Sequence, residues 1–218
     1  MAKEDVKNLE KALDDDERIE LFFSKHWKKV LGAAVVILLA GVVAYSIYYT
    51  NKKNTEKATL ELASAKAENL PALLEKHSDV PGAAFARLRL AHYQFGKKQY
   101  EEAAGNFLAF ANDASTPKEL GIHARFSAGA CKEYAGKSDE ALTIYRAVYD
   151  DQAASIAARN EAAFQLGRLY LSMDKKDEAK NILKSVAEAE LINNPADPGV
   201  AAGMQWQGMC KALYESID

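Results

Sequence analysis

The 218-residue sequence predicts an all-α protein with an N-terminal single transmembrane helix, followed by an α-solenoid of about three helix hairpins plus capping helices. Three observations predict this fold class. One block of twenty residues near the N-terminus contains no charged residue. Behind it, a pattern of small and large residues recurs at intervals of 38 residues. The composition favours helices, because alanine is common, proline occurs only five times, and valine and isoleucine concentrate in the apolar block.

The apolar block Val30–Tyr49 has the length of a membrane span. At 1.5 Å per residue, its twenty residues cover about 30 Å, the thickness of the hydrocarbon core of a bilayer. A tryptophan and two lysines precede it (27–29), three tyrosines lie at its C-terminal end (45–49) and two lysines follow (52–53), as is typical of membrane interfaces. We therefore expect residues 30–50 to be a transmembrane signal anchor and residues 1–29 to be a short cytoplasmic tail.

Two other interpretations of this block are less favoured. A buried core helix would need apolar residues elsewhere in the chain to surround it, and the rest of the chain is not apolar enough. A cleaved signal peptide could end after Ala44, but the 29 residues before the block are rich in acid, and the block is longer than the apolar region of a usual signal peptide. Basic residues are slightly more numerous on the N-terminal flank, which predicts a cytoplasmic N-terminus and an exported C-terminal region.

The tail itself carries a weak helical pattern. Val6, Leu9 and Leu13 share one face of a helix. This segment is either an interfacial or partner-binding helix or a partly disordered tail.

The repeat becomes visible when the chain is aligned on three alanines that each follow an acidic pair. Ala103, Ala141 and Ala179 are spaced by 38 residues. Twelve residues before each lies a small residue, and four residues after each lies a large one: Ala91, Gly129 and Gly167, and then Phe107, Tyr145 and Leu183. Each unit is predicted to be a helix, a polar turn and a second helix, with the small residue allowing close helix approach and the large residue filling the gap.

One such hairpin cannot bury its apolar faces alone, but stacked neighbours can. We expect repeat cores at about 84–117, 122–155 and 160–193, within a domain that covers residues 51–218. Residues 55–79 should pack on the first hairpin, with Pro71 starting a helix. Residues 199–216 should form a capping helix.

The spacing resembles the tetratricopeptide repeat, whose pattern is Leu-Gly, then Tyr, Ala and an aromatic residue. The third unit matches best, with Leu166, Gly167, Tyr170 and Ala179, and with Leu183 in place of the aromatic. The first unit keeps Leu90, Ala91, Ala103 and Phe107, and the second keeps Gly129, Ala141 and Tyr145. Gln94 and Lys132 replace the tyrosine in these two units, and the interval of 38 exceeds the family's period of about 34. The resemblance implies a right-handed solenoid.

In that family, the first helix of each repeat lines a concave face. The corresponding residues here are Phe85, Leu88, His92, Phe95, His123, Phe126, Ala130, Glu133, Glu161, Phe164, Arg168 and Leu171, with Trp206 and Met209 in the capping helix. Such a groove suits an apolar peptide or a partner helix. The plain alternative is that the aromatic residues are core residues and that Arg168 and Glu161 are solvated charges.

The organisation of the whole chain resembles the YfgM-like ancillary subunits of the bacterial SecYEG translocon. The residues that carry this resemblance are the tail with "FFSKHWKK", the single apolar span and the repeats behind it. The resemblance implies a single-pass protein of the bacterial inner membrane with a periplasmic domain. It also implies protein partners among translocon components, periplasmic chaperones or exported clients, and it implies no catalysis.

The sequence offers little for other functions. It lacks the phosphate-loop, dinucleotide, zinc-protease and serine-hydrolase motifs, so we expect no enzyme, no cofactor and no small-molecule substrate. The four histidines are scattered, and a net charge of −3 gives no footprint for nucleic acid. Cys131 and Cys210 are expected to be free buried thiols. The leading expectation is an adaptor that links the translocon to chaperones; the alternatives are a scaffold for cell division or outer-membrane assembly, and a cytosolic repeat domain.

Overall fold

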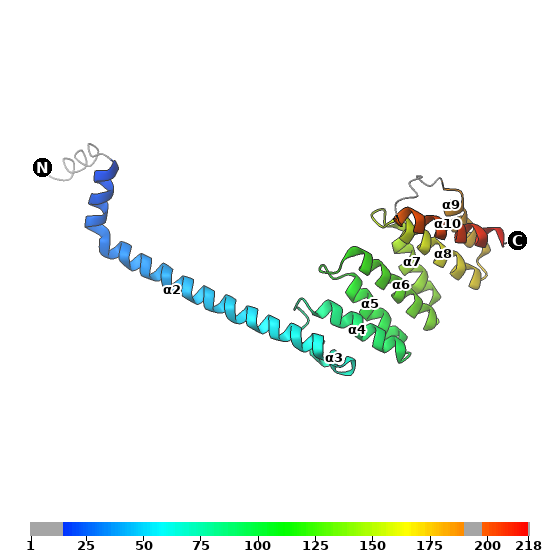
Figure 1. Ribbon diagram of the computed structural model, residues 1–218, viewed down its shortest axis with the longest axis horizontal. Helices are drawn as coiled ribbons and strands as arrows, with labels where there is room; N and C mark the ends of the chain where they lie inside the picture. Colours follow the sequence, from blue (N-terminus) through cyan, green and yellow to red (C-terminus); the bar gives the residue numbers. More distant parts are fainter. Residues whose placement is uncertain (1–14, 190–197, 218) are drawn as a thin grey trace. The chain divides into compact units, whose positions relative to one another are not determined.

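A computed structural model describes residues 15–189 and 198–217, and every regular element in these ranges is a helix (Figure 1). The prediction of an all-α chain is confirmed over these ranges. The elements in chain order are α2 (Asp15–Ser64), the short 3-10 helix η1 (Ala67–Asn69), α3 (Leu70–Lys76), α4 (Ala83–Gly96), α5 (Tyr100–Ala111), α6 (Lys118–Tyr134), α7 (Ser138–Asp150), α8 (Ile156–Ser172), α9 (Lys176–Ala187) and α10 (Pro198–Glu215). Val6, Leu9 and Leu13 lie outside the described residues.

The chain divides into two compact units, one up to Glu56 and one from Lys57 onward. The second unit begins six residues later than the predicted boundary at residue 51. The reason is that α2 continues without interruption beyond the apolar block, and its first residue in the core of the second unit is Ala58, which is 4% exposed.

Helix α2 is long and apolar enough to cross a membrane, and it is the one such helix among the described residues. None of its most apolar stretch is buried. The large apolar side chains from Leu31 to Tyr49 are exposed, which contradicts the alternative of a core helix. The chain therefore has an N-terminal helix of the kind that anchors proteins in membranes.

The second unit starts with the last turns of α2, which pack on α3 and α4. Leu62 is fully buried in this cluster together with Leu70 and Leu90. Pro71 lies in the first turn of α3, as predicted from its fixed backbone angle. The guanidinium group of Arg89 on α4 donates hydrogen bonds to the carbonyl oxygens of Leu62, Ala63 and Ala65, so it caps the C-terminal end of α2.

The following six helices pack on one another in sequence order, α4 on α5, α5 on α6, and so on to α9. Helix α10 packs on both α8 and α9 and so covers the last pair. In Figure 1, α4 to α10 lie side by side. Each of the pairs α4–α5, α6–α7 and α8–α9 is a helix hairpin, and the cores between them consist mostly of alanine, leucine and aromatic side chains.

The turns between the paired helices recur at the same interval of 38 residues as the sequence pattern. Lys98, Gly136 and Asp174 all have positive φ angles, of 63°, 75° and 59°. In each turn, the amide N–H of the next residue donates to a carbonyl oxygen five residues earlier, at 2.8–2.9 Å. This is the hydrogen bond of a Schellman helix end. The three hairpins therefore share one turn geometry, although only Gly136 is a glycine.

The predicted contacts between small and large residues are also observed. A Cβ atom added to Gly129 would lie 2.4 Å from the ring of Tyr145, and one added to Gly167 would lie 2.6 Å from the side chain of Leu183. The residues expected to pack the hairpins are buried, apart from the partly buried Tyr170. They are Leu90, Ala91, Ala103, Phe107, Gly129, Ala141, Tyr145, Leu166, Gly167 and Ala179.

Both cysteines are free and buried, Cys131 in α6 and Cys210 in α10. Burial raises the pKa of the Cys131 thiol to about 11 and that of the Cys210 thiol to about 12. Since the thiolate is the reactive form, these thiols are poor nucleophiles near neutral pH.

Candidate functional site

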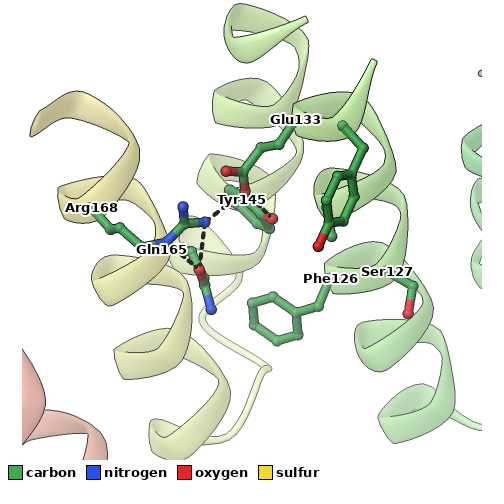
Figure 2. A pocket seen from close by; sticks show the side chains of 8 residues that line it. Phe126, Ser127, Glu133, Tyr145, Gln165 and Arg168 are labelled. Atoms are coloured by element: carbon green, nitrogen blue, oxygen red, sulfur yellow. Dashed lines mark hydrogen bonds and ion pairs between the residues drawn. The ribbon is translucent and has the colours of Figure 1, made fainter. Parts of the chain in front are cut away.

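Two adjoining cavities lie along α6 and α8, and Phe126 lines both of them. The larger, of about 670 Å³, is named here the Arg168 cavity. Its lining residues come from α6, α7 and α8 (Figure 2): Phe126, Ser127, Ala130, Glu133, Tyr134, Tyr145, Gln165 and Arg168. The smaller, of about 280 Å³, is named the Glu161 cavity. It is lined by Glu119, Ile122, His123, Phe126, Ser155, Ala157, Ala158, Glu161, Ala202 and Trp206.

Polar contacts between helices organise the Arg168 cavity. The guanidinium group of Arg168 on α8 donates to Glu133 Oε1 on α6 at 2.7 Å. The hydroxyl group of Tyr145 on α7 donates to the same oxygen at 2.8 Å. Figure 2 shows Arg168 and Gln165 on one helix, with Phe126 opposite on another. The Arg168 side chain is 43% exposed, so it is partly solvated, and it also bridges two hairpins through this ion pair.

These contacts fix the protonation of the site. The hydrogen bond with Glu133 raises the pKa of Arg168. Burial, followed by the hydrogen bond to Glu133, raises the pKa of Tyr145. Both groups hold their protons through the neutral pH range, and the single proton of the Tyr145 hydroxyl is already donated to Glu133. The cavity therefore offers the remaining N–H groups of Arg168 and aromatic faces, and not an acid–base pair.

The Glu161 cavity is more apolar and lies between α6, α8 and α10. Trp206 on α10 packs against Phe164 on α8, with ring centroids 5.6 Å apart. Glu161 is partly buried, and this burial raises its carboxyl pKa, whereas the nearby His123 lowers it to a smaller extent. Glu161 makes no hydrogen bond or ion pair within the described part of the chain.

The structure brings together the predicted groove residues of α6, α8 and α10 but not those of α4. Phe85 packs edge-on against Phe110, and His92 packs edge-on against Phe107. Leu88 packs against the core cluster of the first two hairpins. These residues, together with Phe95, line neither cavity. Leu88 is partly buried against the core, whereas Phe85, His92 and Phe95 are exposed.

Leu171 and Met209 also line neither cavity, although Met209 is 37% exposed. Phe164 reaches the site only through its contact with Trp206. The tetratricopeptide positions therefore include some, but not all, of the side chains that line the two cavities.

Several residues of the site were not predicted from the sequence. Tyr145 was predicted only as a packing residue, yet its hydroxyl group reaches the Arg168 cavity. A buried tyrosine hydroxyl usually finds a hydrogen-bond partner, so the burial predicted for Tyr145 could have indicated this contact. Tyr134 is 64% exposed and stacks on Tyr100, with ring centroids 5.2 Å apart. Its position next to Glu133 is outside the family's groove pattern, so the pattern could not identify it.

The position where Lys132 replaces the family's tyrosine has a different role. Its ammonium group is 2.6 Å from the carboxylates of both Glu101 and Glu140, and Lys137 approaches the same two carboxylates. Only 13% of the Lys132 side chain is exposed. This network links α5, α6 and α7 and so bridges neighbouring hairpins.

The part of the chain that the structure describes contains no group of three His, Cys, Asp or Glu residues that could hold a metal ion. A comparison of the chain with protein-family models, with curated proteins and with solved structures finds no match.

Proposed function

We propose that the protein is a membrane-anchored, non-catalytic adaptor that binds segments of other proteins along α6, α8 and α10. The observation that carries this proposal is the pair of adjoining cavities, because aromatic side chains and the Arg168 guanidinium group line them and suit a peptide or a helix that contacts both. The exposed apolar helix α2 supplies a means of anchoring it.

We further propose that the hairpins form a right-handed solenoid of the tetratricopeptide type. The support is the common turn at Lys98, Gly136 and Asp174 and the contacts of Gly129 and Gly167 with large residues sixteen positions later. An experimental structure tests this directly, since a left-handed or irregular stack would contradict it.

The proposed cellular setting is the bacterial inner membrane, with a cytoplasmic N-terminus and a periplasmic repeat domain. There the protein would link the Sec translocon to periplasmic chaperones or exported clients. This proposal rests on the order of tail, span and repeats, and on the excess of basic residues before the span. A scaffold for another envelope complex is the alternative.

Co-purification of the full chain after mild detergent extraction tests the partners. We expect translocon subunits or periplasmic chaperones among the recovered proteins. Recovery of only cell-division or outer-membrane assembly proteins would favour the alternative, and recovery of no envelope protein would contradict both.

Protease accessibility tests the orientation. In spheroplasts with an intact inner membrane, added protease should degrade the region from Lys57 onward. Protection of this region until the membrane is broken would place the hairpins in the cytosol and would contradict the proposed setting.

A further inference from the structure

The Glu161 cavity contains carboxylates, but no lysine or arginine lines it. Glu161 projects from α8 and Glu119 from the first turn of α6. Neither carboxylate makes a hydrogen bond or an ion pair within the residues that the structure describes. His123 is the remaining titratable residue of the lining.

The nearest cations along the chain are engaged elsewhere. Lys118 lies 3.5 Å from Asp151, and the guanidinium group of Arg159 donates to Gln152 at 3.1 Å. Residues 190–197, which lie outside the described residues, contain no lysine or arginine. The segment that leads into α10 therefore has no cation to place beside Glu161.

The rest of the lining is suited to a cation with an apolar stem. Trp206 and Phe126 supply aromatic faces, which attract ammonium and guanidinium groups. Ile122 and the alanines of α8 and α10 supply an apolar surface for methylene groups. The cavity's volume of about 280 Å³ lies below the range of roughly 300–1,000 Å³ for small-molecule sites, so it suits a single side chain of a larger ligand.

We propose that the Glu161 cavity takes the side chain of a lysine or arginine that belongs to the protein segment bound along α6 and α8. This inference rests on the proposed function, because the remainder of that segment would lie in the Arg168 cavity, which adjoins it at Phe126. Burial raises the pKa of the Glu161 carboxyl, and the nearby His123 lowers it to a smaller extent, so this carboxylate has lost water without gaining an equal counter-charge. A bound lysine or arginine side chain supplies the counter-charge and so offsets the free-energy cost of burying the Glu161 carboxylate.

Photocrosslinking of the full chain in its own membrane tests the proposal. A benzophenone amino acid replaces Phe126, the residue shared by both cavities, and the captured segment is identified by mass spectrometry. The experiment is repeated with Glu161→Gln, which removes the charge and keeps the shape. Glu102→Gln is the matched control, because Glu102 is an exposed acid in the first turn of α5. Circular dichroism checks that all variants keep their helices.

The expected captured segment contains a lysine or arginine within about four residues of the crosslink, one helical turn. Glu161→Gln should lower the adduct yield by about fivefold, the effect of losing one partly buried charge pair, and Glu102→Gln should leave it unchanged. A segment without a cation, or equal yields in the two variants, would overturn the inference and leave the proposed function standing. Absence of any protein adduct from Phe126 would overturn the proposed function and the inference together.

A second measurement isolates the contact itself. The captured segment is synthesised with its lysine or with norleucine, and each peptide is titrated against the full-length protein in detergent. Norleucine should weaken binding to the wild-type chain by about fivefold and should have no effect on binding to the Glu161→Gln chain. An equal loss in both chains would overturn the proposed contact.

Discussion

At the scale of single residues, Gly129 has even less room for a Cβ atom than Gly167, because the ring of Tyr145 lies against it. The ring of Tyr145 is 2% exposed, and its hydroxyl group is held by Glu133, so it cannot move away from an added methyl group. This pair therefore sets how closely α6 and α7 approach.

Gly129→Ala should lower the free energy of unfolding by about 1–3 kcal/mol, the usual cost of overpacking a core. The matched control is Gly105→Ala in α5, where an added Cβ has nothing within 4 Å. This change should raise stability by about 0.5–1 kcal/mol, because alanine favours a helix over glycine. Denaturant unfolding of the purified chain measures both, and equal effects would contradict the packing account.

Glu161 leads to a pH-dependent prediction. Burial raises its pKa in the folded chain, so the folded state binds more protons than the unfolded state between the ordinary pKa of 4.5 and the raised value. Stability therefore falls as the pH rises through this window. Glu161→Gln lacks this loss, so the variant should gain stability relative to the wild-type chain as the pH increases above 4.5. Melting temperatures across pH measure this, and a constant difference between the two chains would contradict it.

At the scale of elements, the three turns test whether the hairpins are equivalent. Gly136 has a φ angle of 75° and nothing within 4 Å of an added Cβ, so Gly136→Ala has only a backbone cost, of about 1–2 kcal/mol. Lys98 has a φ angle of 63° in the same turn of the first hairpin. Lys98→Gly should raise stability, by up to about 1 kcal/mol. Loss of stability from Lys98→Gly in denaturant unfolding would contradict the shared geometry.

The network around Lys132 should stabilise the hairpins above acid pH. Hydrogen bonds from Lys132, and then from Lys137, lower the pKa of Glu101 and that of Glu140. A lowered pKa contributes stability that is complete above the ordinary value of 4.5 and is lost as the pH falls through the folded value. In the Lys132→Met variant, the free energy of unfolding should therefore fall less steeply than in the wild-type chain as the pH drops below 4.5. A decline as steep as that of the wild-type chain would show that the network does not contribute.

The sequence predicted some of these elements for steric reasons. Small and large residues at a fixed interval can be recognised because a close helix contact leaves few choices of side chain, as at Gly129 and Gly167. The ion pairs of Lys132 and Arg168 could not be predicted, because their partners lie on other helices and many exposed acids were equally available. Phe85 and His92 follow the groove pattern, but they contact Phe110 and Phe107 of α5 and line neither cavity, and a linear pattern does not contain those contacts.

At the scale of the whole molecule, the account requires that the chain be held in a membrane by α2. Leu38 lies in the apolar block and is 68% exposed, and Leu60 is 70% exposed in the same helix beyond the block. Leu38→Arg should cost about 3 kcal/mol of insertion free energy and should lower the fraction of the chain that resists alkaline extraction. Leu60→Arg should leave this fraction unchanged, and equal behaviour of the two variants would contradict the anchor.

The central claim is that an anchored chain binds a protein partner along α6 and α8. Its most direct test compares partner recovery in mild detergent from three chains: wild type, the double variant Phe126→Ala with Arg168→Ala, and the control Thr143→Ala, whose side chain is exposed on α7. All three are compared at a temperature at which circular dichroism shows them folded. The account predicts about a tenfold lower recovery from the double variant alone. Equal recovery from all three chains would contradict it.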